Sequence, residues 1–317
     1  MKQLPDINII EQAAKRIERH IHRTPVLKSA NLNDFVKAEV FFKCENFQKA
    51  GAFKSRGAVN AIFSLSNDEV KNGVCTHSSG NHAAALARAA ILRNTKAFIV
   101  MPENSSVVKI AAVKNYGGII TFCKPNLKSR EETLDKVRQK TNAIEIHPYN
   151  DYTIIAGQAT AAKELYEETD NLDIIMAPVG GGGLLSGTAL STHYISPSTI
   201  VVAAEPAGAN DAYKSFYRGK FIPSVNPETI ADGLLTSLGS LTFPIIKKYV
   251  DKIITVSENG IIEAMKLIWE RMKIIIEPSS AVPFAAVFEN KSYFQNKRIG
   301  IIISGGNVDL NKIPWIK

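Results

Sequence analysis

Short apolar runs alternate with amphipathic helical patterns along almost the whole chain of 317 residues, and this rhythm limits the folds available to it. In segments such as 81–94 and 130–141, apolar residues recur at helical spacing, and these segments lie between runs rich in Ile and Val. Strands and helices that alternate in this way form parallel sheets covered by helices on both faces. We therefore predict an α/β fold with strands at 38–45, 73–79, 96–102, 118–123, 143–148, 172–179, 198–206, 252–257 and 298–306.

The chain has no internal repeat, low-complexity segment or long linker, so its length is the guide to its domains. A chain of this length makes one large domain or two lobes. Residues 72–145 are a compact run of strands and helices that is able to form a small sheet of its own. We expect this small domain to be inserted into a large domain made of residues 1–68 and 146–317.

The net charge of +8 is compatible with nucleic acid or membrane binding, but Lys and Arg are scattered and form no block. This pattern favours an enzyme for anionic metabolites, without nucleic acid or membrane partners. Cys44, Cys75 and Cys123 form neither a CxxC pair nor a zinc spacing, which favours a reducing compartment. Residues 1–21 read as an amphipathic helix rather than a signal peptide, and no apolar run approaches the roughly 20 residues that cross a bilayer. We expect a cytoplasmic protein.

Four consecutive glycines, 180–183, follow an apolar strand and open a helical pattern in the stretch PVGGGGLLSG. Backbone without Cβ atoms allows a ligand to approach closely, and the N–H groups at a helix start attract an anion. The stretch lacks the Gly-Lys-Ser/Thr ending of a P-loop, and Leu185 stands where a dinucleotide-binding motif requires glycine. Glu205 nevertheless ends the next strand, as a ribose-binding acid would. The loop therefore predicts a phosphate site, with a nicotinamide enzyme or a plain flexible turn as alternatives.

Two further loops place polar groups after predicted strands. The stretch HSSGNHAAA combines the hydroxyls of Ser78 and Ser79 with the side chains of Asn81 and His82 at a helix start. Such a loop suits a carboxylate or a phenolic oxygen, although Ser and Asn are also common helix caps. In the stretch IIISGGNVDL, Ser304 follows an apolar strand, either as a cap or as a neutral partner for a ligand atom.

Lys54 lies in the stretch GAFKSRGA, beside Phe53 and small residues. Most lysines lie on the surface, but an amine acts as a nucleophile only when it is neutral, and burial lowers its pKa. An amine that forms a covalent bond, a phosphate site and a neutral hydroxyl are the groups that bind pyridoxal 5′-phosphate (PLP). Together the four loops predict a PLP enzyme.

The same motifs carry a resemblance that covers residues 10–310. FQKAGAFKSRGA, HSSGNHAAAL, IAGQ, PVGGGGLLSG, AAEPAGAND, TIADG, ERMKIIIEPSSA and ISGGNVDL follow one another in this order. Through these motifs and their order, the chain resembles the serine racemase and serine/threonine ammonia-lyase family of fold type II PLP enzymes. The resemblance implies a two-lobed fold similar to tryptophan synthase β, with mostly parallel twisted sheets covered by helices.

The resemblance also implies roles for the residues of the four loops. Lys54 would hold PLP covalently, Phe53 would pack near its ring, and Asn81 would bond its phenolic oxygen. Ser304 would contact the pyridine nitrogen. The phosphate would be bound by the N–H groups of Gly180, Gly181, Gly182, Gly183 and Leu184.

For the substrate, the resemblance places Ser79 across the cofactor plane from Lys54. Racemisation needs an acid/base group on each face of Cα, and these two residues meet that need. Arg130 matches a position that swings toward the substrate, and Thr236 stands where a serine would touch it. The predicted substrate contacts are Ser78, Ser79, His82, Arg130 and Thr236.

A divalent-metal site is implied by the stretch EPAGAND, with oxygens from Glu205, the Ala209 carbonyl and Asp211. Oxygen ligands suit Mg²⁺, with Ca²⁺ or Mn²⁺ as alternatives, while the residues alone favour a plain polar loop. Ala50 replaces a threonine in a stretch linked to nucleotide activation in animal serine racemases, so ATP activation is left open. A homodimer is a further expectation from the family.

The predicted activity is the racemisation of L-serine to D-serine, together with serine/threonine ammonia-lyase activity that gives a 2-oxo acid and ammonia. The substrate is therefore a small amino acid. A threo-3-hydroxyaspartate ammonia-lyase is the nearest alternative, because its motifs are almost the same. A nicotinamide-dependent dehydrogenase and a non-catalytic ligand-binding module are the more distant ones.

Overall fold

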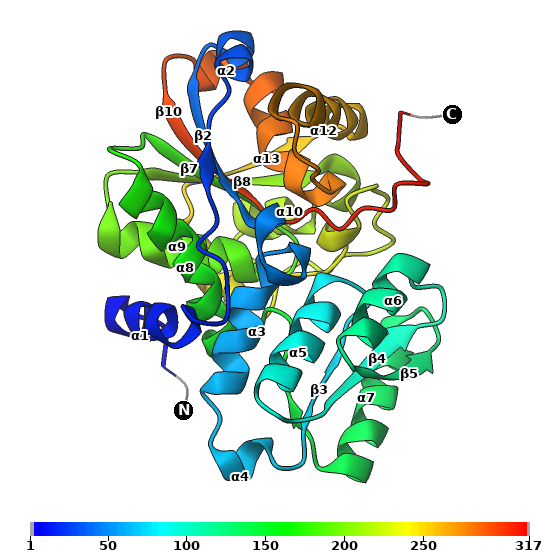
Figure 1. The fold of residues 1–317 in the computed structure, drawn as a ribbon. Helices are drawn as coiled ribbons and strands as arrows, with labels where there is room; N and C mark the ends of the chain where they lie inside the picture. The colour runs from blue at the N-terminus through cyan, green and yellow to red at the C-terminus, as the bar shows by residue number, and fades with distance from the viewer. Residues whose placement is uncertain (1–2, 316–317) are drawn as a thin grey trace.

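Two sheets organise the described residues, 3–315, of the computed structural model (Figure 1). The large sheet has the strand order β1-β2-β10-β7-β8-β9, and the small sheet has the order β5-β4-β3-β6. All neighbouring strands pair in parallel except β1 and β2. The strands are β1 (Val26–Leu27), β2 (Glu39–Cys44), β3 (Val74–His77), β4 (Ala97–Pro102), β5 (Ile119–Cys123), β6 (Ile144–Glu145), β7 (Ile174–Pro178), β8 (Ile200–Pro206), β9 (Lys252–Val256) and β10 (Arg298–Ile303).

The predicted α/β class and the predicted strands are confirmed, because each predicted range contains one of the strands β2 to β10. The sequence prediction missed β1. This strand has only two residues, so it carries no alternation that a pattern could reveal, and it exists because it pairs antiparallel with β2.

Helices cover both sheets (Figure 1). The helix expected at the N-terminus is α1, which buries Ile10, Ala13 and Ile17. The helix expected from residue 130 begins earlier, at Leu127, because Asn126 caps it by accepting the Ser129 N–H. The helices are α1 (Ile7–Ile17), α2 (Ala30–Val36), α3 (Lys54–Phe63), α4 (Asn67–Val70), α5 (Asn81–Leu92), α6 (Val107–Asn115), α7 (Leu127–Thr141), α8 (Tyr152–Glu168), α9 (Gly183–Ile195), α10 (Asp211–Arg218), α11 (Thr242–Tyr249), α12 (Glu258–Met272), α13 (Pro278–Glu289) and α14 (Lys291–Phe294), with short 3₁₀ helices η1 (Glu45–Phe47), η2 (Lys49–Gly51), η3 (Ala207–Ala209) and η4 (Asp232–Leu234).

The two faces of the large sheet bury separate apolar clusters. Ile301 and Ile303 of β10 pack with residues of α2, α12 and α13, whereas Ile302 packs on the opposite face with residues of α8 and α9. This alternation is the period of two that a strand imposes on its side chains. Central strands buried on both faces explain why β7, β8 and β10 are continuous apolar runs.

The small sheet packs against a helix from outside its own segment of the chain. Its strands all come from residues 74–145, but one of its apolar clusters includes Ala58, Val59 and Ile62 of α3. Helices α3 and α5 therefore lie side by side between the two sheets (Figure 1). The division into domains at 1–68, 72–145 and 146–317 stays a prediction.

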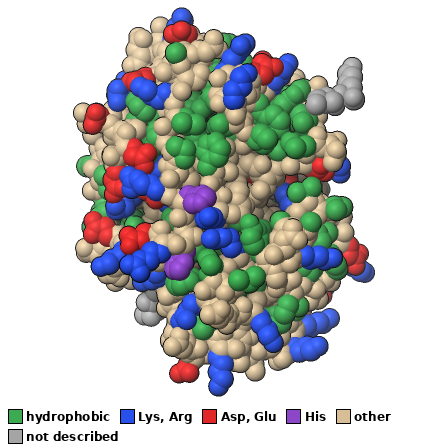
Figure 2. Space-filling view, in the orientation of Figure 1, with side chains coloured by type: hydrophobic (Ala, Val, Ile, Leu, Met, Phe, Trp, Pro, Cys, Tyr) green, Lys and Arg blue, Asp and Glu red, His purple; other side chains and the backbone are tan. Residues whose placement is uncertain are grey.

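The surface shows the dispersed charge that the sequence indicates. Basic side chains are interspersed with acidic and apolar ones over the face in Figure 2. Cys44, Cys75 and Cys123 are buried free thiols. Within residues 3–315, none of the helices has both the length and the apolar character needed to cross a membrane.

Candidate active site

The loops at the carboxyl ends of the parallel strands bring the predicted site residues together. Because β7, β8 and β10 run in parallel, the glycine loop, Glu205 and Ser304 lie at one edge of the large sheet. The turn before Lys54 is attached to the same edge. Phe53 donates its N–H to the carbonyl of Ser304 at 2.9 Å, and Ala52 forms a β-bridge with Gly305.

Lys54 is the first residue of α3, and its amine faces the interior of the site. The Nζ atom donates to the carbonyl of Pro148 at 2.8 Å and lies 5.1 Å from the ring centroid of Phe53. Burial lowers the pKa of the amine to about 8, although the charge of Glu277 raises it in part. A larger fraction of the amine is therefore neutral near pH 7 than in an exposed lysine, which is what a nucleophile requires.

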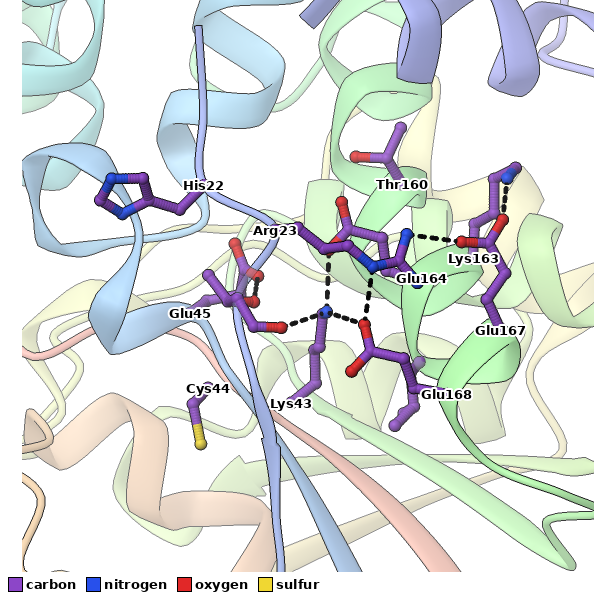
Figure 3. A network of polar contacts seen from close by, with 12 residues as sticks. His22, Arg23, Lys43, Cys44, Glu45, Thr160, Lys163, Glu164, Glu167 and Glu168 are labelled. Carbon is purple, nitrogen blue, oxygen red and sulfur yellow. Dashed lines mark hydrogen bonds and ion pairs between the residues drawn. The ribbon is translucent and has the colours of Figure 1, made fainter. Parts of the chain in front are cut away.

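A buried ion network holds α3 at Arg56, two residues after Lys54, and Figure 3 shows its members Lys43, Glu45 and Glu164. The guanidinium of Arg56 donates to both carboxylate oxygens of Glu45, at 2.7 and 2.8 Å, and to both oxygens of Glu164, each at 2.7 Å. Lys43 lies 2.8 Å from the same Glu164 carboxylate. These contacts join α3 to η1 and α8, and α8 to β2, so the helix that carries Lys54 cannot shift without breaking them.

The four glycines form a loop in which no side chain would fit. A Cβ atom built on Gly180, Gly181, Gly182 or Gly183 would approach a neighbouring atom to 2.9, 2.4, 2.8 or 2.9 Å, all shorter than real contacts. Gly182, which caps α9, also has a φ of +85° that favours glycine. The loop therefore has the narrow, side-chain-free form that the predicted phosphate site requires.

Asn81 is held by two side chains that the sequence reasoning did not assign. Its Nδ2 donates to the two oxygens of Glu277, at 2.8 and 3.1 Å, and its Oδ1 accepts from Asn307 Nδ2 at 3.0 Å. Burial raises the pKa of the Glu277 carboxyl to about 7. Glu277 belongs to the EPSSA stretch that carried the resemblance, but nothing local in that stretch indicates contact with Asn81.

Ser304 is buried and its hydroxyl has a hydroxyl neighbour. Its Oγ lies 2.9 Å from the Oγ of Ser280, which also accepts the Gly305 N–H and lies 2.7 Å from the Gly305 carbonyl. Ser280 donates its single hydrogen to the Gly305 carbonyl, so Ser304 is the donor in the pair of hydroxyls. The Ser304 hydroxyl rotates about its C–O bond and is able to turn the same hydrogen to a neutral ring nitrogen instead.

The predicted substrate contacts differ in their degree of burial. Ser78 and Ser79 are partly buried in the loop between β3 and α5. His82 is buried, and since a carbonyl only accepts, its Nε2 donates to the Ile146 carbonyl at 3.2 Å. Arg130 has a buried Nε with no partner among the described residues, and Thr236 is exposed and bonds the hydroxyl of Tyr149.

The predicted metal ligands lie beyond β8. Glu205 accepts the N–H groups of Ala212 and Tyr213 at the start of α10, at 2.9 and 2.7 Å. Burial raises the pKa of Glu205 to about 8 and that of Asp211 to about 6. Asp211 Oδ2 is buried with no partner within residues 3–315, so an oxygen-seeking cation fits this place. The described residues contain no group of three or more His, Cys, Asp or Glu side chains suited to a metal.

A buried amine with a lowered pKa, a side-chain-free glycine loop and a buried hydroxyl are groups that fit PLP. The family model "pyridoxal-phosphate dependent enzyme" matches residues 17–305. The chain belongs to this family of α/β enzymes, and the match excludes the nicotinamide alternative.

Two serine racemases and a dehydratase are among the similar proteins. The chain is 52% identical to a serine racemase of Dictyostelium discoideum, covering 97% of this chain and 96% of that one. It is 50% identical to a β-hydroxyaspartate dehydratase of Paracoccus denitrificans, covering 98% and 99%. The structure of maize serine racemase matches with a TM-score of 0.95 and 46% identity, covering 98% and 95%.

Proposed function

We propose that this chain is a PLP-dependent serine racemase that also acts as a serine/threonine ammonia-lyase. The observation that carries the proposal is Lys54, whose amine has a lowered pKa and lies on the same sheet edge as the glycine loop and Ser304. Both similar racemases described above support it by their identity over nearly the full chain. An absorption band in the visible range that borohydride removes would verify the covalent bond to Lys54, and its absence would refute it.

In this proposal each loop has one task. Lys54 holds the cofactor covalently, with Phe53 near the ring. Asn81 bonds the phenolic oxygen, and Ser304 donates to the ring nitrogen. The N–H groups of Gly180, Gly181, Gly182, Gly183 and Leu184 bind the phosphate.

PLP withdraws electrons from the Cα of a bound amino acid and so makes its proton acidic. Once the substrate amine has replaced it on the cofactor, the freed neutral Nζ of Lys54 would take this proton from L-serine on one face. Ser79 Oγ donates a proton to the opposite face, which yields D-serine. When the β-hydroxyl leaves as water instead, the products after hydrolysis are pyruvate and ammonia. Ser78 and neighbouring N–H groups bind the substrate carboxylate, while His82 and Thr236 complete the contacts.

The replacement of Ser79 separates the two reactions. In S79A we expect D-serine formation from L-serine to fall by about 10²-fold or more, because one of two acid/base groups is lost. Pyruvate formation from L-serine should persist, because the Lys54 face is unchanged. S78A is the matched control in the same loop and should not abolish racemisation. D-serine formation by S79A at the wild-type rate would contradict the assignment.

A threo-3-hydroxyaspartate ammonia-lyase is the second candidate. The 50% identical β-hydroxyaspartate dehydratase supports it, and the unpartnered Nε of Arg130 is a donor for a second carboxylate. Rates with L-serine, D-serine, L-threonine and both threo-3-hydroxyaspartates, followed by chiral product and keto acid, would decide between the candidates. A preference of R130Q for serine over hydroxyaspartate would support the second one.

A divalent cation, Mg²⁺ in the first place, is proposed at Glu205, the Ala209 carbonyl and Asp211. Two buried carboxylates with raised pKa values gain from a positive charge, which supports the proposal. Chelation should then lower both melting temperature and activity, and added Mg²⁺ should restore them. Unchanged stability and activity in chelator would count against the metal.

A homodimer is proposed on the grounds of the family, and a cytoplasmic location on the three buried free cysteines, which suit a reducing compartment. Sedimentation of the purified protein at micromolar concentration would measure the assembly, and a monomer would contradict it. ATP activation is not proposed, because Ala50 replaces the threonine expected there.

A further inference from the structure

A three-residue segment after β6, His147 to Tyr149, contacts both Lys54 and the glycine loop. The carbonyl of Pro148 accepts the Lys54 Nζ hydrogen bond at 2.8 Å. The neighbouring side chain of Tyr149 lies against Gly181 and Gly183. A Cβ on Gly181 would be 2.4 Å from Cδ1 of the Tyr149 ring, and one on Gly183 would be 2.9 Å from Tyr149 Cβ. The segment therefore sets the separation between the amine and the loop.

Two side chains hold the Tyr149 ring in this place. Its edge-on partner is the His147 ring, with centroids 4.6 Å apart and planes at 90°. The Nδ1 atom of His147 in turn accepts the Asn150 N–H at 2.9 Å, which fixes the turn of the backbone. The Tyr149 hydroxyl bonds the side chain of Thr236.

Burial raises the pKa of the Tyr149 phenol above its usual value, although the bond to Thr236 lowers it in part. The ring has two torsions, and its contacts on the edge, the face and the hydroxyl leave neither free.

A loop of four glycines needs such a neighbour. Glycine loses more conformational freedom on ordering than any other residue, and the loop has no side chains with which to pack. The rigid Tyr149 ring against Gly181, with its Cβ and backbone against Gly183, supplies that packing at small entropic cost, because only two torsions are fixed.

We propose that Tyr149 is the positioning residue of the phosphate-binding loop, holding Gly181 and Gly183 at a set distance from Lys54. The inference rests on the proposed function, because it concerns the loop that binds the phosphate of PLP. In this proposal the Tyr149 ring packs against the loop and the Tyr149 hydroxyl bonds Thr236. Substitution by Ala removes both contacts, whereas substitution by Phe removes only the hydroxyl.

The test compares Y149A with Y149F in binding of PLP and of pyridoxal, which lacks the phosphate, to the apo-protein. We expect Y149A to weaken the binding of PLP by about tenfold or more, while the affinity for pyridoxal changes by less than about threefold. Y149F keeps the ring and should hold PLP within about threefold of wild type. An unchanged ratio of PLP to pyridoxal affinity in Y149A would overturn the proposal.

Tyr166 provides the matched control, because its hydroxyl bonds Thr192 at 3.0 Å in a similar tyrosine–threonine pair away from the loop. Y166A removes a ring of equal size and should lower the melting temperature without changing the PLP-to-pyridoxal ratio. A ratio that falls in Y166A as far as in Y149A would show a general loss of stability and overturn the proposal.

The contact itself is tested by a second pair of variants. In G181A the new methyl group collides with the Tyr149 ring, so PLP binding weakens. In the Y149A background the ring is gone, and G181A should weaken PLP clearly less than it does in wild type. Additive effects of the two substitutions would contradict the contact. Wild-type protein that binds no PLP would refute the proposed function instead, so the two failures are distinguishable.

Discussion

Lys54 and Arg56 are two residues apart on α3, and the structure treats their charges in opposite ways. Arg56 is fully buried between Glu45 and Glu164, whose charges and hydrogen bonds raise its pKa despite the burial. Lys54 donates to the neutral carbonyl of Pro148, and burial lowers its pKa to about 8. A buried cation with carboxylate partners is inert and structural, whereas one without them becomes a neutral nucleophile.

The same contrast extends to the acidic groups. Arg56 and Lys43 lower the pKa of Glu164 in the ion network, although burial alone would raise it. Around the site, burial raises the pKa of Glu277 to about 7 and lowers that of His147 to about 4. The network thus favours charged forms and the site favours neutral ones. Clusters of groups with such shifts are typical of functional sites.

The largest expected effect comes from removing the nucleophile. K54A should lose the visible cofactor band and lower turnover of L-serine by at least about 10²–10⁴-fold, because both the covalent bond and the base are lost. K49A changes a lysine on the same turn and should keep both. A coloured, active K54A variant, measured by absorbance and pyruvate release, would place the nucleophile elsewhere.

The second effect is on stability. R56M leaves the buried Glu45 carboxylate without a cationic partner and Glu164 with Lys43 alone, which should reduce the free energy of unfolding by about 3–5 kcal/mol. Denaturant titration measures this loss. R23Q breaks the exposed ion pair with Glu167 and should cost less than about 1 kcal/mol. An R56M variant as stable as R23Q would show that the network is not what holds α3.

The smallest expected effect is the contribution of Lys54 to the pH dependence of the free energy of unfolding of the apo-protein. From pH 8 to 10.5 the unfolded chain binds a proton at this lysine that the folded chain does not, so stability rises with pH. The unfolding free energy of wild type minus that of K54M should therefore increase across this window. The upper limit is about 3 kcal/mol, and partial exposure of the lysine reduces it. A difference that stays flat would mean that the amine is not desolvated.

Local patterns were sufficient for most of the fold and for the loops of the site. The apolar runs predicted the strands β2 to β10, and runs of small and polar residues predicted the loops that hold Gly180, Asn81 and Ser304. The two-residue strand β1 was missed because its only signal is its partner. Sequence reasoning also missed the contacts of Glu277 with Asn81 and of Ser280 with Ser304. Glu277 and Ser280 lie at the start of α13, and no local pattern relates them to their partners.

By itself, the sequence determined the α/β class and the order of the loops, and it predicted Lys54 as the reactive lysine, because periodicity and motif are properties of neighbouring residues. The tertiary structure decided which buried charges are paired and which are left neutral. It also decided what stands beside the glycines: Tyr149 is about thirty residues from them along the chain, and only folding brings its ring against Gly181. Contacts of this kind depend on packing between distant segments, which no local pattern encodes.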